Sequence, residues 1–177
     1  EYTKLIPKPM VKIGKFPIII HIMNHYLNYG FNEFIIATGY KSNIFKKYFK
    51  NFKKSKKKFY TVIFKKKCSV TILDTGIKTM TGGRLKKTIN FLDDGNFMFT
   101  YGDGISSVNL KKLENFHTKN KKLITVTAVR PPARFGEIIL KKNTVSSFKE
   151  KPQVNNGWIN GGFFIAKKGF LKLIHED

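Results

Sequence analysis

The chain has 177 residues, the size of one domain, and its 41% hydrophobic content is enough to form one core. Its 17 Phe and 7 Tyr argue against intrinsic disorder. The net charge of +23 is almost entirely lysine, and because specific phosphate and base recognition favours Arg, we interpret most of it as a solvated surface. The single cysteine excludes an internal disulfide, and no apolar run approaches the ~18 residues of a membrane span. These features predict a cytoplasmic protein.

Helical and strand patterns alternate from the start of the chain. Residues 17–29 carry apolar side chains at helical spacing, with a proline near the start and a glycine just past the end. Residues 34–39 form a short apolar run closed by glycine, which is typical of a buried strand. Ser42 is a candidate cap for a second, lysine-rich amphipathic helix that ends near Phe52.

The alternation continues to the end of the chain. Strands are predicted over residues 59–64, 70–73, 97–101, 124–129, 135–140, 145–148 and 158–166, helices over 85–92, 110–117 and from about 167 onward, and an exposed turn at 65–67. This alternation predicts an α/β fold with a mainly parallel central sheet and helices on both faces. Because ligands bind beyond the carboxyl ends of strands in such sheets, the residues that follow each strand are candidate site residues.

A glycine-flanked aspartate follows one predicted strand. In Tyr101-Gly102-Asp103-Gly104 the glycines allow tight turning and close approach by a ligand. An aspartate at the carboxyl end of a strand can bind Mg²⁺ together with phosphate oxygens. A turn in which the aspartate satisfies the backbone explains this segment equally well on its own.

A lysine between two prolines lies near the start of the chain. Pro7 and Pro9 stiffen the backbone around Lys8, which suits a fixed positive charge for a phosphate. Taken alone, the segment is explained better as an ordinary entry loop with a solvated lysine.

A glycine-rich segment, residues 79–85, precedes a predicted helix. Glycines at a helix start free backbone N–H groups for an anion or a base edge, and Arg84 is one of only three arginines. The spacing is not that of a Walker loop, and an ordinary helix N-terminus is the alternative.

Two further polar segments lie in the last third of the chain. Glu150 and Asn160 are candidates for hydrogen bonds to sugar hydroxyls, and Lys151 is a candidate for a sugar phosphate. Without context, two surface turns are the better explanation.

The order of these segments is more specific than any one of them. They occupy residues 8–14, 17–23, 35–40, 73–76, 80–85, 99–104, 132–136, 148–152 and 159–164. In this order they resemble the nucleotidyltransferases that activate sugar 1-phosphates, and in particular the branch that transfers a cytidylyl group to glucose 1-phosphate. The resemblance covers essentially the whole chain.

The resemblance implies a Rossmann-like nucleotidyltransferase fold in a single domain, residues 1–177. It implies the reaction of CTP with glucose 1-phosphate to give CDP-glucose and pyrophosphate, with Mg²⁺ as cofactor. The site residues it implies are Lys8 as the catalytic phosphate contact, Thr79, Arg84 and Gly102 for the nucleotide, Glu150, Lys151, Asn160 and Gly161 for the sugar phosphate, and Asp103 for the metal.

The resemblance also implies a homo-oligomer that binds neither nucleic acid nor a membrane. Compared with the family, we expect residues 1–177 to lack an N-terminal glycine-rich loop and a C-terminal portion with a second metal-binding aspartate. Two alternatives stay open at this point. One is a sister uridylyl- or thymidylyltransferase; the other is a non-catalytic basic protein that binds nucleotide or nucleic acid.

Overall fold

The computed structural model describes residues 4–50, 53–55, 58–131, 136–150 and 157–175. The helices are α1 (Ile18–Leu27), α2 (Ser42–Phe49), α3 (Thr81–Lys86) and α4 (Leu110–Asn120), with short 3-10 helices η2 (Lys8–Met10), η3 (Ile89–Phe91) and η4 (Lys168–Leu173). The strands are β1 (Lys12–Ile13), β2 (Phe16–Pro17), β3 (Glu33–Thr38), β4 (Lys53–Ser55), β5 (Lys58–Ile63), β6 (Lys66–Asp74), β7 (Asn96–Thr100), β8 (Ile124–Val129), β9 (Glu137–Lys141), β10 (Thr144–Lys149) and β11 (Ile159–Lys167).

The larger sheets are mixed or antiparallel rather than mainly parallel. One has the strand order β3-β6-β5-β4, in which β3 and β6 are parallel and the other neighbours are antiparallel. The other, β7-β11-β8, is antiparallel throughout. The short connection between β5 and β6, where Phe64 and Lys65 both have positive φ, forces an antiparallel pair because a parallel pair needs a long crossover. The turn lies at Phe64 and Lys65 rather than over the predicted residues 65–67, because Lys66 already belongs to β6.

Most predicted elements are confirmed within a few residues, and the first helix shows why. Pro17 precedes the first residue of α1, and Gly30 adopts a φ of 88° shortly after the last. The apolar side chains of α1 form its buried face, as the spacing predicts.

The second helix begins where expected but is not capped by Ser42. Lys41 occupies the cap position with a φ of 52° and makes no side-chain cap bond. The Ser42 hydroxyl instead lies 2.8 Å from Thr38 Oγ1, at the end of β3. This tertiary contact replaces the local cap, and Phe52 lies outside the described residues.

The third helix begins earlier in the chain than the sequence predicts. The sequence pattern gives a helix over 85–92, whereas α3 already begins at Thr81 and ends at Lys86 before η3. Just beyond its end, the Thr88 hydroxyl donates to the Leu85 carbonyl at 2.7 Å, a local bond that competes with continued helix. The last predicted helix, from about residue 167, is the 3-10 helix η4.

Two apolar clusters hold the body of the molecule together. The first packs α1 and α2 onto β3, β5 and β6, with Phe49 and Val70 completely buried. The second packs Leu110 of α4 and Phe163 of β11 against Ile22 and Tyr26 of α1. Helix α1 therefore contributes to both clusters and connects the two sheets.

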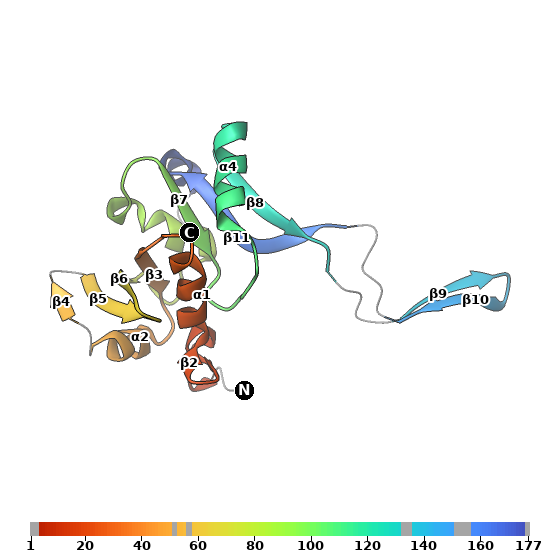
Figure 1. The fold of residues 1–177 in the computed structure, drawn as a ribbon, viewed down its shortest axis with the longest axis horizontal. Coiled ribbons are helices and arrows are strands. Elements are labelled where there is room, and N and C mark those ends of the chain that lie inside the picture. The colour runs from red at the N-terminus through yellow and green to blue at the C-terminus, as the bar shows by residue number, and fades with distance from the viewer. Residues whose placement is uncertain (1–3, 51–52, 56–57, 132–135, 151–156, 176–177) are drawn as a thin grey trace.

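The β9–β10 hairpin extends away from this body (Figure 1). Its register shifts between Val145 and Ser147, which marks a bulge. Ile138, Leu140 and Phe148 are each more than half exposed, so the hairpin contributes no side chain to the two buried clusters.

Candidate active site

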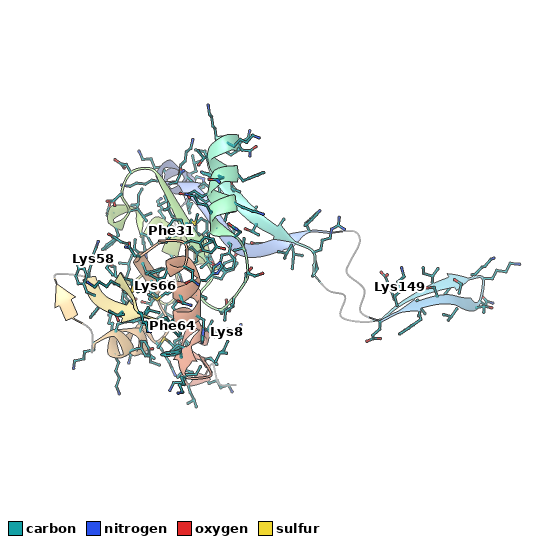
Figure 2. All side chains as sticks on the ribbon, viewed as in Figure 1. Lys8, Phe31, Lys58, Phe64, Lys66 and Lys149 are labelled. Atoms are coloured by element: carbon teal, nitrogen blue, oxygen red, sulfur yellow. The ribbon has the colours of Figure 1, made fainter. Side chains whose placement is uncertain are left out.

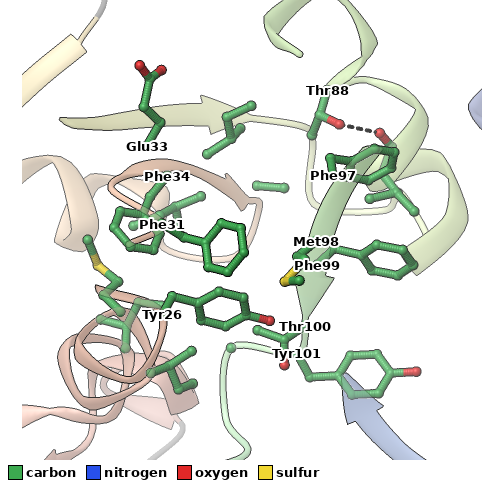
Figure 3. A pocket seen from close by; sticks show the side chains of 18 of the residues that line it. Tyr26, Phe31, Glu33, Phe34, Thr88, Phe97, Met98, Phe99, Thr100 and Tyr101 are labelled. Atoms are coloured by element: carbon green, nitrogen blue, oxygen red, sulfur yellow. Dashed lines mark hydrogen bonds between the residues drawn. The ribbon is translucent and has the colours of Figure 1, made fainter. Parts of the chain in front are cut away.

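A cavity of about 530 Å³ separates the edge strands of the two sheets. Residues 33–37 of β3 and 96–100 of β7 line it without a gap. Because successive side chains of a strand point to opposite faces, a cavity lined by five consecutive residues of each strand runs along the strand edges. Figure 3 shows side chains of α1 and β3 facing those of β7 across this space. Near the carboxyl ends of these two strands, the cavity is bordered by Pro9, Arg84, Tyr101 and Gly102.

The predicted phosphate contact and the predicted metal ligand meet at this end. Lys8 Nζ lies 3.7 Å from Asp103 Oδ2, and their side chains are 67% and 42% exposed. Lys8 opens the short helix η2 after an extended Pro7, with Pro9 directly behind it. Asp103 follows β7, so a strand end and a proline-stiffened turn position the two charges.

Gly102 allows this close approach. A Cβ atom on Gly102 would lie only 2.8 Å from Pro9 Cγ, closer than packed atoms tolerate. The absent side chain therefore lets the turn of Lys8 pack against the end of β7. The sequence pointed to Gly102 as a nucleotide neighbour, and the structure adds this packing role.

Asn160 and Gly161 lie beside the same strand end. Asn160 Nδ2 donates to the Tyr101 hydroxyl at 3.0 Å, and its Oδ1 accepts from the Gly162 N–H at 2.8 Å. A Cβ on Gly161 would lie 2.9 Å from the Thr127 carbonyl oxygen, so β11 and β8 cross closely where the register of β11 is irregular. Asn160 is thus placed against Tyr101, two residues before Asp103, and Gly161 follows it on β11.

Thr79 and Arg84 form a second group, beyond the carboxyl end of β3. Arg84 Nη1 donates to the Thr38 carbonyl at 3.0 Å and to Thr75 Oγ1 at 2.7 Å, while Nη2 donates to the Ile77 carbonyl at 3.1 Å. The Thr79 hydroxyl donates to the Thr75 carbonyl at 2.6 Å. Two of the three predicted nucleotide residues, Thr79 of the loop after β6 and Arg84 of α3, therefore lie close together and both bond to that loop.

Sequence reasoning did not single out Gly39 and Thr75 as site residues, although both belong to this network. Thr75 is 2% exposed, and a Cβ on Gly39 would collide with the Arg84 guanidinium. The available signals were a glycine directly after one strand and a threonine directly after another, which many proteins carry for turns alone.

Among the described residues, Glu150 is not brought to this site. Glu150 follows β10, and Figure 2 shows its neighbour Lys149 on the hairpin, well separated from Lys8. Lys151 lies outside the described residues. The roles of Glu150 and Lys151 stay predictions.

The described residues offer no other obvious chemistry. No group of three or more His, Cys, Asp or Glu among them could hold a metal ion. Burial raises the pKa of the Cys68 thiol to about 11, so this side chain stays protonated and unreactive at neutral pH. None of the helices in the described part of the chain is long and apolar enough to cross a membrane.

Comparison with known proteins defines the class. Residues 2–177 match the family model described as Nucleotidyl transferase, and the chain belongs to that family. It is 41% identical to the glucose-1-phosphate cytidylyltransferase of Salmonella typhimurium, over 100% of this chain and 73% of the relative. It is 35% identical to a probable glucose-1-phosphate cytidylyltransferase of Bacillus subtilis, over the same shares.

Solved structures confirm the fold. HddC from Yersinia pseudotuberculosis superimposes with a TM-score of 0.66 at 22% identity, covering 94% of this chain and 70% of that one. A UDP-glucose pyrophosphorylase complexed with UDP-glucose also gives 0.66, at 17% identity, covering 98% and 72%. The α/β nucleotidyltransferase fold expected from the sequence is therefore correct, with mixed and antiparallel sheets in the described residues.

Proposed function

We propose that this protein transfers a cytidylyl group from CTP to glucose 1-phosphate, giving CDP-glucose and pyrophosphate. The observation that carries the choice of nucleotide and sugar is the 41% identity, over the whole chain, to a glucose-1-phosphate cytidylyltransferase. In the reaction, a phosphate oxygen of glucose 1-phosphate bonds to the α-phosphorus of CTP. The bond from that phosphorus to the bridging oxygen breaks, and pyrophosphate leaves with the electron pair.

The geometry around Lys8 suits this in-line transfer. Such a reaction needs positioning and charge neutralisation more than a covalent nucleophile. Lys8 supplies a positive charge on a stiffened turn, at the carboxyl end of β7 and 3.7 Å from Asp103 Oδ2. We assign Lys8 to the phosphates and Gly102 to the surface on which the nucleotide lies.

Asp103 fits the single-carboxylate part of a magnesium site. Its side chain is 42% exposed and its Oδ2 already faces a cation, Lys8 Nζ. Mg²⁺ is commonly held by one or two carboxylates together with phosphate oxygens and water. One aspartate and the oxygens of a bound triphosphate therefore supply ligands of the types that Mg²⁺ uses. When bound, the ion neutralises negative charge on the phosphates; Asp103 would hold it beside Lys8.

The two groups of residues divide the substrates between them. Thr79 and Arg84 lie beyond β3 and are assigned to the nucleotide. Asn160 and Gly161 lie beside the end of β7 and are assigned to the sugar phosphate. The assignment of Glu150 and Lys151 to the sugar phosphate rests on the resemblance alone, since Glu150 follows β10 of the separate hairpin. This division accounts for two polar groups that lie beyond the carboxyl ends of two different strands, β3 and β7.

The decisive experiment offers the intact protein Mg²⁺, glucose 1-phosphate and one nucleotide at a time: CTP, UTP or dTTP. We expect pyrophosphate release that is fastest with CTP, and CDP-glucose identified by mass spectrometry. Release with UTP or dTTP but not with CTP would reject the cytidylyl assignment in favour of a sister enzyme. No release with any nucleotide would reject catalysis.

The proposed partners are these two substrates and further copies of the same chain. The homo-oligomer stays a prediction, which light scattering on the intact protein tests directly. A single monomeric mass at all concentrations would contradict it.

A further inference from the structure

The Arg84 guanidinium is held by the loop that it borders. Its three N–H···O bonds reach the end of β3 through the Thr38 carbonyl, the end of β6 through the Thr75 hydroxyl, and the following loop through the Ile77 carbonyl. A planar guanidinium tied at three points has one orientation. Arg84 thus connects β3, α3 and the loop of residues 74–79.

Thr75 has two separate functions in this network. Its hydroxyl donates to the Thr38 carbonyl at 2.7 Å and accepts from Arg84 Nη1 at the same distance. Its carbonyl accepts from Thr79 Oγ1 at 2.6 Å and from Lys87 Nζ at 2.9 Å. Because Thr75 is almost completely buried, these bonds are shielded from water and restrict the loop strongly.

Gly39 leaves the space that the guanidinium occupies. A Cβ atom there would lie 2.2 Å from Arg84 Nη1, 2.6 Å from Nη2 and 2.5 Å from the Gly76 carbonyl oxygen. The arginine could turn away from such a contact, but the backbone carbonyl could not. Any side chain at position 39 must therefore displace either Arg84 or the loop.

We propose that Thr75 and Gly39 are positioning residues for the nucleotide site, which act by fixing Arg84 and the loop 74–79 before a nucleotide arrives. This proposal rests on the proposed function, because Thr79 and Arg84 are there assigned to the nucleotide. A loop ordered in advance does not lose conformational freedom on binding, so the network lowers the KM for the nucleotide.

The first test measures the loop without any nucleotide. Thr75→Val keeps the shape of the side chain and removes the hydroxyl, whereas Thr75→Ser keeps the hydroxyl. Thr71→Val is the matched control, since Thr71 is a buried threonine of β6 outside the loop. We expect faster amide hydrogen exchange over residues 75–80 in Thr75→Val than in wild type, Thr75→Ser or Thr71→Val. Equal exchange in all four proteins would overturn the proposal.

The second test uses the nucleotide that the wild-type protein prefers, whichever it is. A lost hydrogen bond to a charged group corresponds to about a tenfold effect or more. We expect Thr75→Val to raise the KM for the nucleotide about tenfold, with the KM for the sugar phosphate within about twofold, and Thr75→Ser to recover most of the nucleotide affinity. Faster loop exchange with unchanged nucleotide KM, or an equal rise in both KM values, would reduce Thr75 to a structural residue and overturn its positioning role.

The two tests separate this proposal from the proposed function. Wild-type preference for UTP over CTP would reject the cytidylyl assignment and still leave the Thr75 comparison valid. If the wild type transfers no nucleotide at all, affinity is measured by titration of CTP binding, with the same expected pattern. Gly39→Ala should show the Thr75→Val pattern in both tests; a well-folded Gly39→Ala protein with wild-type values would contradict its part in the network.

Discussion

Lys8 Nζ lies 3.7 Å from Asp103 Oδ2, and the two residues come from opposite halves of the chain. An exposed ion pair of this kind contributes only about 0–1 kcal/mol to stability. Its more important property is that both side chains remain accessible to solvent, next to the cavity residues Pro9 and Gly102. A phosphate or a cation can therefore exchange with either partner at little energetic cost.

Removing the Lys8 charge should impair turnover more than folding. We expect Lys8→Ala to lower kcat by about 10²-fold or more, because preorganised charge at a transferring phosphoryl group has effects of that size. Thermal unfolding should change by no more than a few degrees. The matched control, Lys47→Ala on the exposed side of α2, should keep wild-type kcat. Equal kcat values in the two variants would show that Lys8 does not act on the phosphates.

Neutralising Asp103 should disturb the dependence on the metal. We expect Asp103→Asn to lower turnover severely and to raise the Mg²⁺ concentration needed for half-maximal rate, because an amide is a weaker ligand than a carboxylate. Asp94→Asn is the control: Asp94 is 99% exposed and pairs with Lys168. An unchanged magnesium titration in Asp103→Asn would contradict the assignment.

A methyl group at Gly102 should separate the two charges. Because its Cβ would lie 2.8 Å from Pro9 Cγ, Gly102→Ala must push the turn of Lys8 away from β7. We expect kcat to fall about tenfold or more, in keeping with the cost of small misplacements in a reacting site. Gly169→Ala, where a Cβ meets nothing within 4 Å, should keep wild-type activity. A fully active Gly102→Ala protein would show that this packing does not position Lys8.

His117 should make stability fall in mild acid. It is fully buried, its Nδ1 lies 2.8 Å from Thr125 Oγ1, and burial lowers its pKa, with a smaller contribution from the positive charge of Lys167. Below about pH 6.5 the unfolded chain binds a proton at this residue that the folded protein resists. The unfolding free energy should therefore decrease as pH falls through that range.

Chemical denaturation between about pH 7.5 and about pH 5 measures this effect, because these limits lie on either side of the ordinary histidine pKa. His117→Gln should be less stable overall, because it loses a fitted side chain, but its stability should depend less on pH over the same range. An identical slope in the wild type and the variant would show that His117 does not cause the decline.

Local patterns predicted the individual elements well and their partners poorly. The apolar spacing of α1 and the glycine-closed run of β3 depend on neighbouring residues, so both were found. The sequence predicts a helix cap for the Ser42 hydroxyl because that is its common local role, yet this hydroxyl bonds to Thr38 of another element. Strand direction likewise depends on connections and packing, which periodicity does not record.

The sequence alone determined the order of helices and strands, which follows from short-range preferences: proline stiffness, glycine freedom and apolar spacing within a few residues. The order of the motifs, through the resemblance it carries, predicts Lys8, Arg84 and Asp103 as site residues, and their roles stay predictions. Only the tertiary structure decided that Lys8 meets Asp103, and that Gly39 and Thr75 fix the Arg84 guanidinium. Those contacts join segments far apart in the chain, so they depend on how both sheets pack around α1 rather than on any local pattern.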